Sequence, residues 1–351
     1  MRDPAASALQ YGVLLPHFGR HATAERMRNA GPLIEDLGFD SVWVRDHVIQ
    51  QPHGHEDPDL TYLDAFVVLS AVAATTTRLK LGTAVLIPHR HPILAAMMFG
   101  SLDFIAGGGR VIAGCGIGNW DVEFEAIGLG GWDRREVLEE YVSVLRQLWT
   151  GDAVSHDGQF YRFADVQLRP VPSDEESIPV WYGGNSAAAA RRAAEYCDGL
   201  VASRIPLANF VKRMKRMRRI AGERGRVAPT AAVIPYVVPA DTVQEGMARL
   251  SLAGLLDDLN AHEPPPASGR YETFDDVDGA AVAGPASVII DAVRRFQAEG
   301  AEHFIFDLRP CLEDWEDRLA YLGEHVLPAL HREDLAASAH GERHSARAAI
   351  D

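Results

Sequence analysis

Short apolar runs alternate with longer segments of mixed polarity along most of the chain. The short runs are rich in β-branched and aromatic side chains, which favour buried strands. Strands are predicted at 10–15, 41–45, 79–86, 110–115, 179–182, 198–202, 230–238 and 302–308. Helices are predicted between them at 23–37, 61–75, 92–105, 133–149, 186–196, 207–223, 285–299 and 313–330.

Eight strand–helix units in one chain predict an α/β fold of the (β/α)8 TIM barrel class, because repeated units of this kind form parallel sheets. Two insertions interrupt the rhythm. The one after strand four contains a predicted β-hairpin at 152–168 with a turn at Asp157-Gly158, and the one after strand seven, 241–283, is a helix followed by a loop rich in Pro, Asp and Gly. We expect one domain over 1–331 and a disordered polar tail at 332–351.

Bulk composition narrows the classes of partner. The 351 residues carry a formal net charge of −15, which disfavours nucleic acid and anionic lipid as partners. No apolar run approaches the roughly 20 residues of a membrane span, and the first residues lack the apolar core of a signal peptide. Cys115, Cys197 and Cys311 match no zinc pattern and suggest no disulfide framework. We therefore expect a cytoplasmic protein with buried, inert thiols.

The predicted strand 41–45 runs directly into Asp46 and His47. In a parallel barrel the carboxyl ends of the strands share one mouth, where function collects. An Asp-His pair at that place can bind a polar heterocycle or move a proton. A purely structural role for Asp46, as the cap of a loop, is equally compatible with the local sequence.

Other predicted strand ends carry glycine and histidine. Gly183, Gly184, Asn185 and Ser186 precede a predicted helix, so this loop is either an anion site at the helix start or a tight turn with a cap. Four histidines also lie at or near predicted strand ends, which suggests that they converge on the mouth: His17, His47, His89 and His91.

Two kinds of site are not supported by the sequence. The glycine run at 114–118 lacks the spacing of a dinucleotide fingerprint, and no helix is predicted directly after it. The strand ends also lack the spacing of metal ligands, so no metal site is expected.

Ordered motifs over about residues 10–330 resemble the bacterial luciferase-like monooxygenase superfamily, in particular its coenzyme F420-dependent branch. They comprise Gly38 to Val44 with Asp46-His47, residues 74–83, Arg90 to Pro92, Leu102-Asp103, Gly109-Arg110, Gly114 to Gly118 with Glu123 and Gly128, Arg134 with Glu140, residues 148–151, 158–161 and 179–184, and Asp198-Gly199.

The resemblance implies a TIM barrel that uses reduced F420, or alternatively FMN, at the carboxyl-end mouth. It implies that the cofactor ring lies over a bulge after the third strand, near Ala84 and Val85, where the family often has a non-prolyl cis peptide. The other implied contacts are Asp46 at the polar edge of the ring, Ile117 and Gly118 flanking it, and Gly183, Gly184, Asn185 and Ser186 at the cofactor phosphate. His47 is implied near the reactive carbon, where it positions substrate or relays a proton.

Two positions depart from the sugar-phosphate dehydrogenase branch, which has an acid where this chain has Asn119 and a tryptophan where it has Gln51. Sugar oxidation is therefore not expected. The leading hypothesis is an F420-dependent oxidoreductase that acts on an unknown organic substrate. The alternatives are an FMN-dependent monooxygenase using O2, and a non-catalytic flavin-binding accessory protein.

The expected partners are a small-molecule substrate, a second copy of the chain and, for a monooxygenase, a flavin or F420 reductase. F420 carries a polyglutamate tail, for which Arg45, Arg90 and Arg204 are candidate contacts.

Overall fold

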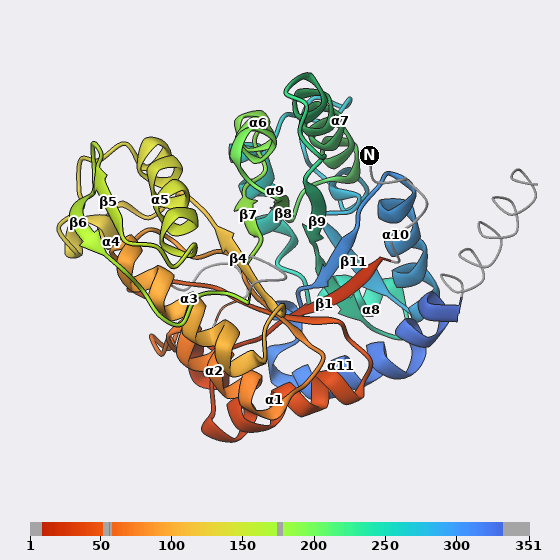
Figure 1. Ribbon diagram of the computed structural model, residues 1–351. Coiled ribbons are helices and arrows are strands. Elements are labelled where there is room, and N and C mark those ends of the chain that lie inside the picture. Colours follow the sequence, from red (N-terminus) through yellow and green to blue (C-terminus); the bar gives the residue numbers. More distant parts are fainter. Residues whose placement is uncertain (1–8, 52–55, 57, 174–177, 333–351) are drawn as a thin grey trace, which may run out of the picture.

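The eight predicted strands close into one parallel barrel in the computed structural model, which describes residues 9–51, 56, 58–173 and 178–332 (Figure 1). Around the barrel the order is β1-β12-β9-β8-β7-β4-β3-β2, and all neighbouring strands are parallel. The barrel strands are β1 (Gln10–Leu14), β2 (Ser41–Val44), β3 (Lys80–Thr83), β4 (Val111–Cys115), β7 (Val180–Gly183), β8 (Gly199–Ser203), β9 (Thr230–Ile234) and β12 (His303–Phe306). The TIM barrel prediction is confirmed.

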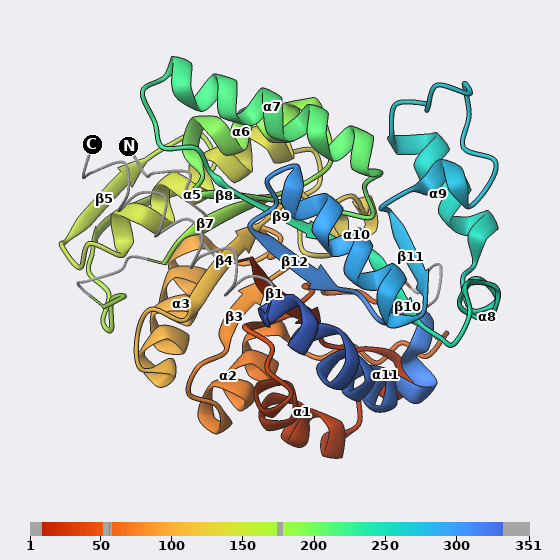
Figure 2. The ribbon, with the colours of Figure 1, turned by 90° about the vertical axis from the view of Figure 1, so that its right-hand side faces the viewer.

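Helices surround the strands on the outside of the barrel (Figure 2). The longer ones are α1 (Ala24–Asp36), α2 (Ala65–Thr75), α3 (Pro92–Ala106), α5 (Arg134–Leu148), α6 (Ala187–Tyr196), α7 (Leu207–Glu223), α9 (Leu252–His262) and α10 (Ala286–Ala298). The shorter ones are η1 (Gly19–His21), α4 (Asp121–Ala126), α8 (Val243–Ala248), η2 (Asp275–Val277), η3 (Arg309–Asp314), α11 (Trp315–Tyr321) and the π-helical η4 (Leu322–Val326).

Side-chain caps explain where several helices begin. Thr23 accepts a hydrogen bond from the amide of Arg26 at the start of α1, as its position predicts. Asp64 accepts from the amides of Phe66 and Val67, so α2 begins at Ala65 rather than at residue 61. The predicted start was wrong because the pattern of apolar residues continues upstream of the cap.

The insertion after β4 contains the predicted hairpin. β5 (Val154–Asp157) pairs antiparallel with β6 (Arg162–Val166), beside α5 (Figure 1). The Glu140 carboxylate on α5 accepts hydrogen bonds from the amides of Gln159, Phe160 and Tyr161, all in the hairpin turn. One carboxylate thus fastens the hairpin to the barrel wall.

The insertion after β9 differs from the prediction. The expected strand 230–238 is divided at Pro235, and β10 (Tyr236–Pro239) pairs in parallel with β11 (Ala281–Gly284) outside the barrel. Pro235 lacks an N–H and cannot continue the ladder, which accounts for the break. β11 was not predicted because only one of its residues, Val282, favours strands, whereas Ala and Gly are depleted in them.

Apolar side chains fill the inside of the barrel as well as the space under the helices. The interior cluster includes Trp43 and Trp181, whose rings lie 5.3 Å apart. The three cysteines are buried and unpaired, as predicted, and burial raises the pKa of the Cys311 thiol to about 11. In the described part of the chain, no helix is both long and apolar enough to cross a membrane.

The end of the chain departs from the predicted helix 313–330. Residues 309–332 form a 3-10 turn, α11, a π-helical turn and a last helical stretch to Arg332. The rest of the predicted tail, 333–351, lies outside the described residues.

Candidate active site

A small cavity of about 160 Å3 opens at the carboxyl ends of the barrel strands. Side chains that end or follow most of the strands line it: Leu14, Arg45, His47, Ala84, Asn119, Trp120, Ser203, Arg204, Ile234 and Arg309. This is the end of a TIM barrel at which active sites are built.

His47 lies in the wall of this cavity and is held from three sides. Its ring stacks on Trp120 with centroids 4.1 Å apart and meets the edge of Tyr62 at 5.5 Å. Its Nδ1 lies 3.1 Å from the Glu123 carboxylate. Because Nδ1 faces Glu123, Nε2 is the nitrogen available to a ligand. The predicted place of His47 at the mouth therefore agrees with the geometry.

Glu123 was quoted in the sequence analysis only as part of a motif, and its contact with His47 was missed. It lies on α4, and its Oε1 also accepts from the amides of Val48 and Ile49. Burial by itself would raise the pKa of Glu123, but the hydrogen bonds from His47 and these amides outweigh it and hold the pKa below its ordinary value. Its motif position was the only signal in the sequence.

Asp46 does not line the cavity, although its neighbours Arg45 and His47 do. Its Oδ2 accepts from Arg90 Nη1 at 2.7 Å and from the amide of Ile87 at 3.2 Å, so the carboxylate ties the end of β2 to the segment after β3. Its Oδ1 is buried and has no hydrogen-bond partner among the described residues. That oxygen is the part of Asp46 that could accept a bond from a bound molecule.

The other three histidines do not line the cavity, so the expected convergence of four histidines is wrong. Nε2 of His17 accepts from the Arg45 amide and Nδ1 donates to the Leu63 carbonyl, which fixes a neutral ring; burial lowers the pKa of His17 to about 3. His89 is buried against Phe124, and His91 caps α3.

The segment after β3 forms the floor of the mouth. The peptide bond between Ala84 and Val85 is cis and non-prolyl, as expected at this position. Ala84 lines the cavity, whereas Val85 packs into the wall against Gly116 and Gly183, where a Cβ would lie 2.3 and 2.4 Å from the valine methyl groups. The two glycines therefore give room to Val85.

The backbone turns sharply after β4, at the mouth of the barrel. Gly118 has φ +67° and lies against Ile87 and Phe124, while Ile117 packs on the outer core. Neither lines the cavity, although both directly precede Asn119, which does. α4 begins at Asp121, and Asn119 and Trp120 separate it from the glycine run, so no helix begins directly after the run.

The loop from Gly183 to Ser186 joins β7 to α6 beside the cavity. The Ser186 hydroxyl caps α6 by accepting from the amide of Ala189. The Asn185 side chain is engaged by the backbone of Ser203, donating to its carbonyl at 2.7 Å and accepting from its amide at 3.0 Å. The first amides of a helix have no partner within it, so an anion could bind here through the main chain rather than through Asn185.

Three arginines reach the mouth, and two of them are strongly paired. Arg45 and Arg309 both contact the Glu56 carboxylate, and Arg309 also contacts Asp307 at 2.6 Å. The third, Arg204, lies 3.6 Å from Asp258 and has φ +49°, a rare conformation for a non-glycine residue.

Arg90 was a candidate for the cofactor tail, and this expectation does not agree with the geometry. Its guanidinium donates to Asp46 at 2.7 Å and to Asp64 at 2.5 Å. It is therefore engaged inside the wall rather than presented at the mouth.

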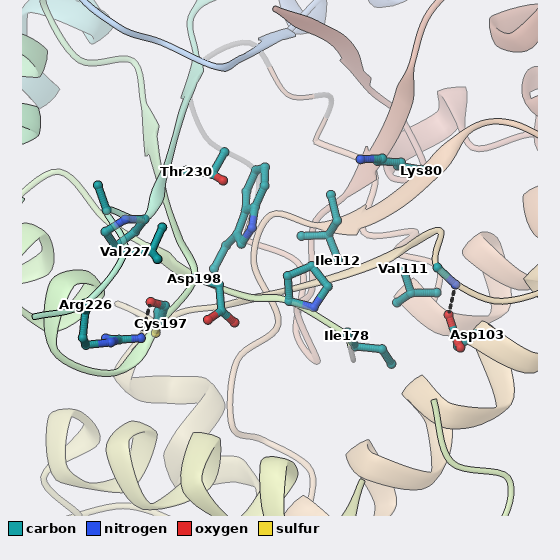
Figure 3. Close-up of a pocket in the computed structure, with 15 residues that line it drawn as sticks. Lys80, Asp103, Val111, Ile112, Ile178, Cys197, Asp198, Arg226, Val227 and Thr230 are labelled. Atoms are coloured by element: carbon teal, nitrogen blue, oxygen red, sulfur yellow. Dashed lines mark hydrogen bonds between the residues drawn. The ribbon is translucent and has the colours of Figure 1, made fainter. Parts of the chain in front are cut away.

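A larger cavity of about 790 Å3 lies at the opposite end of the barrel (Figure 3). Three of its charged side chains already bond to the protein: Asp103 to the amide of Gly109, Asp198 to the amide of Val180, and Arg226 to the carbonyl of Cys197. Because the amino ends of TIM-barrel strands serve stability rather than catalysis, we assign the site to the smaller cavity. No group of metal-ligating side chains occurs within the described residues.

Comparisons with known proteins give consistent matches. A family model described as luciferase-like monooxygenase matches residues 9–303. An F420-dependent glucose-6-phosphate dehydrogenase of Nakamurella multipartita is 28% identical over 346 residues, covering 89% of this chain and 96% of that protein.

Two further matches are shorter or more distant. A 5,10-methylenetetrahydromethanopterin reductase of Archaeoglobus fulgidus is 33% identical over 170 residues, or 48% of this chain and 46% of that protein. The crystal structure of monooxygenase RslO1 from Streptomyces bottropensis superimposes with a TM-score of 0.73 at 23% identity, covering 92% of this chain and 99% of that one. This last likeness concerns the fold alone.

Proposed function

Because the chain belongs to the luciferase-like monooxygenase family, we propose that it is an F420-dependent oxidoreductase that exchanges a hydride with an organic substrate. The observation that carries the proposal is the meeting of His47, the Ala84 floor and the loop from Gly183 to Ser186 around one mouth. A relative described as F420-dependent, aligned over 96% of its length, supports the choice of cofactor.

The residues at the mouth fit such a cofactor. Asp46 Oδ1 is a buried acceptor that no other described residue uses, and the first turn of α6 offers main-chain donors for a phosphate. Ala84 offers a small, flat floor. When bound, F420 would supply or accept the hydride. The cavity of about 160 Å3 is smaller than the roughly 300 Å3 of small ligand pockets, so side chains at the mouth must separate to admit a ring system.

In this proposal His47 holds or moves the proton that accompanies the hydride. His47 lines the cavity with its Nδ1 turned to Glu123, which leaves Nε2 for a ligand, and imidazoles donate or accept protons in many active sites. Asn119 stands nearby without an ionisable group, so we do not propose sugar-phosphate oxidation. The substrate we propose is a small organic molecule with one reducible or oxidisable centre.

The experiment that tests the cofactor is a titration of the purified protein with F420 and with FMN, followed by fluorescence. We expect F420 to bind and FMN to bind at least about tenfold more weakly, since a relative aligned over 89% of this chain is described as F420-dependent. Tight binding of FMN without binding of F420 would contradict the proposal.

A second candidate is an FMN-dependent monooxygenase. The observation that favours it is the pairing of Arg45 and Arg309 with Glu56 and Asp307, which leaves fewer cations for a polyglutamate tail. The same titration separates the two candidates, and O2 consumption with reduced FMN would support the second. A non-catalytic flavin-binding protein would bind a cofactor without turnover.

We also propose that the protein acts as a homodimer. The neighbouring helices α2 and α3 are apolar on nearly all sides and expose Val67, Leu94, Met97, Phe104 and Ile105. Helices that are apolar on all sides are normally buried against other protein segments. A reductase partner is proposed only for the monooxygenase case.

A further inference from the structure

His47 is the one histidine among the described residues that line the cavity, and an imidazole is the side chain best suited to exchanging a proton near neutral pH. The polar neighbours in the wall are Asn119, Ser203 and three arginines, and an arginine keeps its charge at any physiological pH. Whatever proton the site handles, His47 must hold it on Nε2. The state of its other nitrogen then decides what Nε2 can do.

Nδ1 of His47 faces a carboxylate that has nothing to donate. Glu123 Oε2 lies 3.1 Å from Nδ1, and its Oε1 is occupied by the amides of Val48 and Ile49 at 2.8 and 3.2 Å. The Glu123 side chain is 1% exposed, and these donors keep it ionised because they outweigh the cost of burial. An ionised carboxylate only accepts, so Nδ1 carries the proton.

Several other charged or titratable groups surround this pair. His89 Nε2 lies 3.9 Å from Glu123 Oε2, and burial lowers the pKa of His89, so that ring stays neutral. Tyr62 packs on His47 from the segment before α2, and burial raises its pKa. Arg45 lines the same wall, His17 lies behind it, and Asp46 is paired with Arg90. Glu123 is thus the anion in direct contact with the His47 ring.

We propose that Glu123 is a positioning residue that fixes the His47 tautomer, with the proton on Nδ1 and Nε2 turned to the mouth. Trp120 stacks on the His47 ring with centroids 4.1 Å apart, and this contact restricts rotation of the ring. The inference rests on the proposed function for its effect on catalysis, but the tautomer itself does not depend on which cofactor binds.

The discriminating change is Glu123→Gln. The amide oxygen can still accept from Val48 and Ile49, whereas the amide nitrogen would donate toward Nδ1 and favour the reversed tautomer. Loss of the carboxylate also removes the anion that faces Nδ1 of His47. The matched control is Glu125→Gln, which makes the same chemical change at an exposed position of the same helix.

The first readout is the 15N spectrum of histidine-labelled protein, with the His47 signal identified by its loss in His47→Gln. We expect Nδ1–H in the wild type and in Glu125→Gln, and a reversed or mixed tautomer in Glu123→Gln. Nε2–H in the neutral wild-type ring would overturn the proposal, even if Glu123→Gln failed to fold.

The second readout is the pH profile of turnover with the cofactor found in the titration above. We expect Glu123→Gln to lower kcat at least about tenfold with little change in cofactor affinity, and to change the pH dependence of kcat. An unchanged pH profile with a lower kcat would mean that Glu123 only supports the fold, and would overturn the proposal. If neither cofactor binds, the proposed function fails while the tautomer test still stands.

Discussion

Asp46 and His47 are adjacent in the chain, yet the structure gives them opposite surroundings. Successive side chains of an extended chain point to opposite faces, so His47 follows Arg45 to the cavity while Asp46 enters the wall beside Arg90. Of this adjacent polar pair, His47 therefore lines the cavity, and Asp46 forms a salt bridge in the surrounding wall. Because Oδ1 of Asp46 has no hydrogen-bond partner among the described residues, it can still accept a hydrogen bond from a cofactor.

The role of Asp46 can be separated from its salt bridge with Asp46→Asn. We expect cofactor affinity to fall about tenfold, and stability to fall by about 1–3 kcal/mol because Arg90 loses a buried counter-ion. Fluorescence titration and urea unfolding measure the two effects. The control is Asp64→Asn, which also removes a partner of Arg90 but at a half-exposed position outside the mouth. Equal cofactor affinity in both variants would contradict the proposed contact.

At the scale of elements, β3 and β4 approach each other so closely that only glycine fits between them. A Cβ on Gly114 would lie 1.9 Å from the carbonyl oxygen of Thr83, which also binds the Gly114 carbonyl through its hydroxyl. The obstacle is backbone, so it cannot turn aside. This close approach places the floor of the mouth beside the end of β4.

Gly114→Ala should therefore lower the free energy of unfolding by about 3 kcal/mol or more. The control is Gly222→Ala in α7, where a Cβ would meet no atom within 4 Å and should raise stability by about 0.5 kcal/mol. Urea unfolding of both variants checks the pair. Similar stability of the two would mean that β3 and β4 are less tightly packed than described.

The two insertions show which elements the sequence pattern predicts and which it does not. The hairpin at 152–168 was predicted because its turn and alternation are local features. β11 was not, because its pairing with β10 depends on a segment more than 40 residues away rather than on its own composition. The predicted strand 230–238 continued past Pro235, whereas β9 ends directly before this proline.

At the scale of the whole molecule, two buried histidines make stability depend on pH. His17 and His303 both have a pKa lowered to about 3, chiefly by burial. In the unfolded chain they titrate near 6.5, so the unfolded state binds more protons between about pH 3 and 6.5. The free energy of unfolding should thus rise with pH across that window and level off above it.

From pH 7 to pH 5 we expect a loss of about 3–4 kcal/mol, measured by urea unfolding at each pH. His17→Asn removes one titrating ring, so its pH dependence should be about half as steep, whatever its stability at pH 7. A wild-type stability that stays constant over this range would contradict neutral burial of the two rings.

The apolar surface of α2 and α3 is the second property of the whole molecule. α2 contains no charged residue, and the single charge on α3, Asp103, is buried. Such a surface carries no charge pattern to select a different partner, and symmetric pairing of identical chains is the commonest assembly. We therefore expect Phe104, which is 74% exposed in the monomer, to be covered in a dimer.

Phe104→Glu should convert the dimer to a monomer, as measured by light scattering after size-exclusion chromatography. The control is Val227→Glu, which places the same charge at another exposed apolar position, 69% exposed and distant in the sequence. A monomeric wild type, or a dimer in both variants, would contradict this interface.

The sequence by itself determined the barrel class, most helix and strand positions, the family motifs and the presence of a histidine at the second strand end. These features follow from local periodicity and short motifs, which report the backbone and its burial. Only the tertiary structure decided that Glu123 holds His47 across 76 positions of sequence, that Asp46 turns into the wall and that three other histidines leave the mouth. Contacts of that kind form when the barrel closes, and neither periodicity nor composition records which distant side chains then meet.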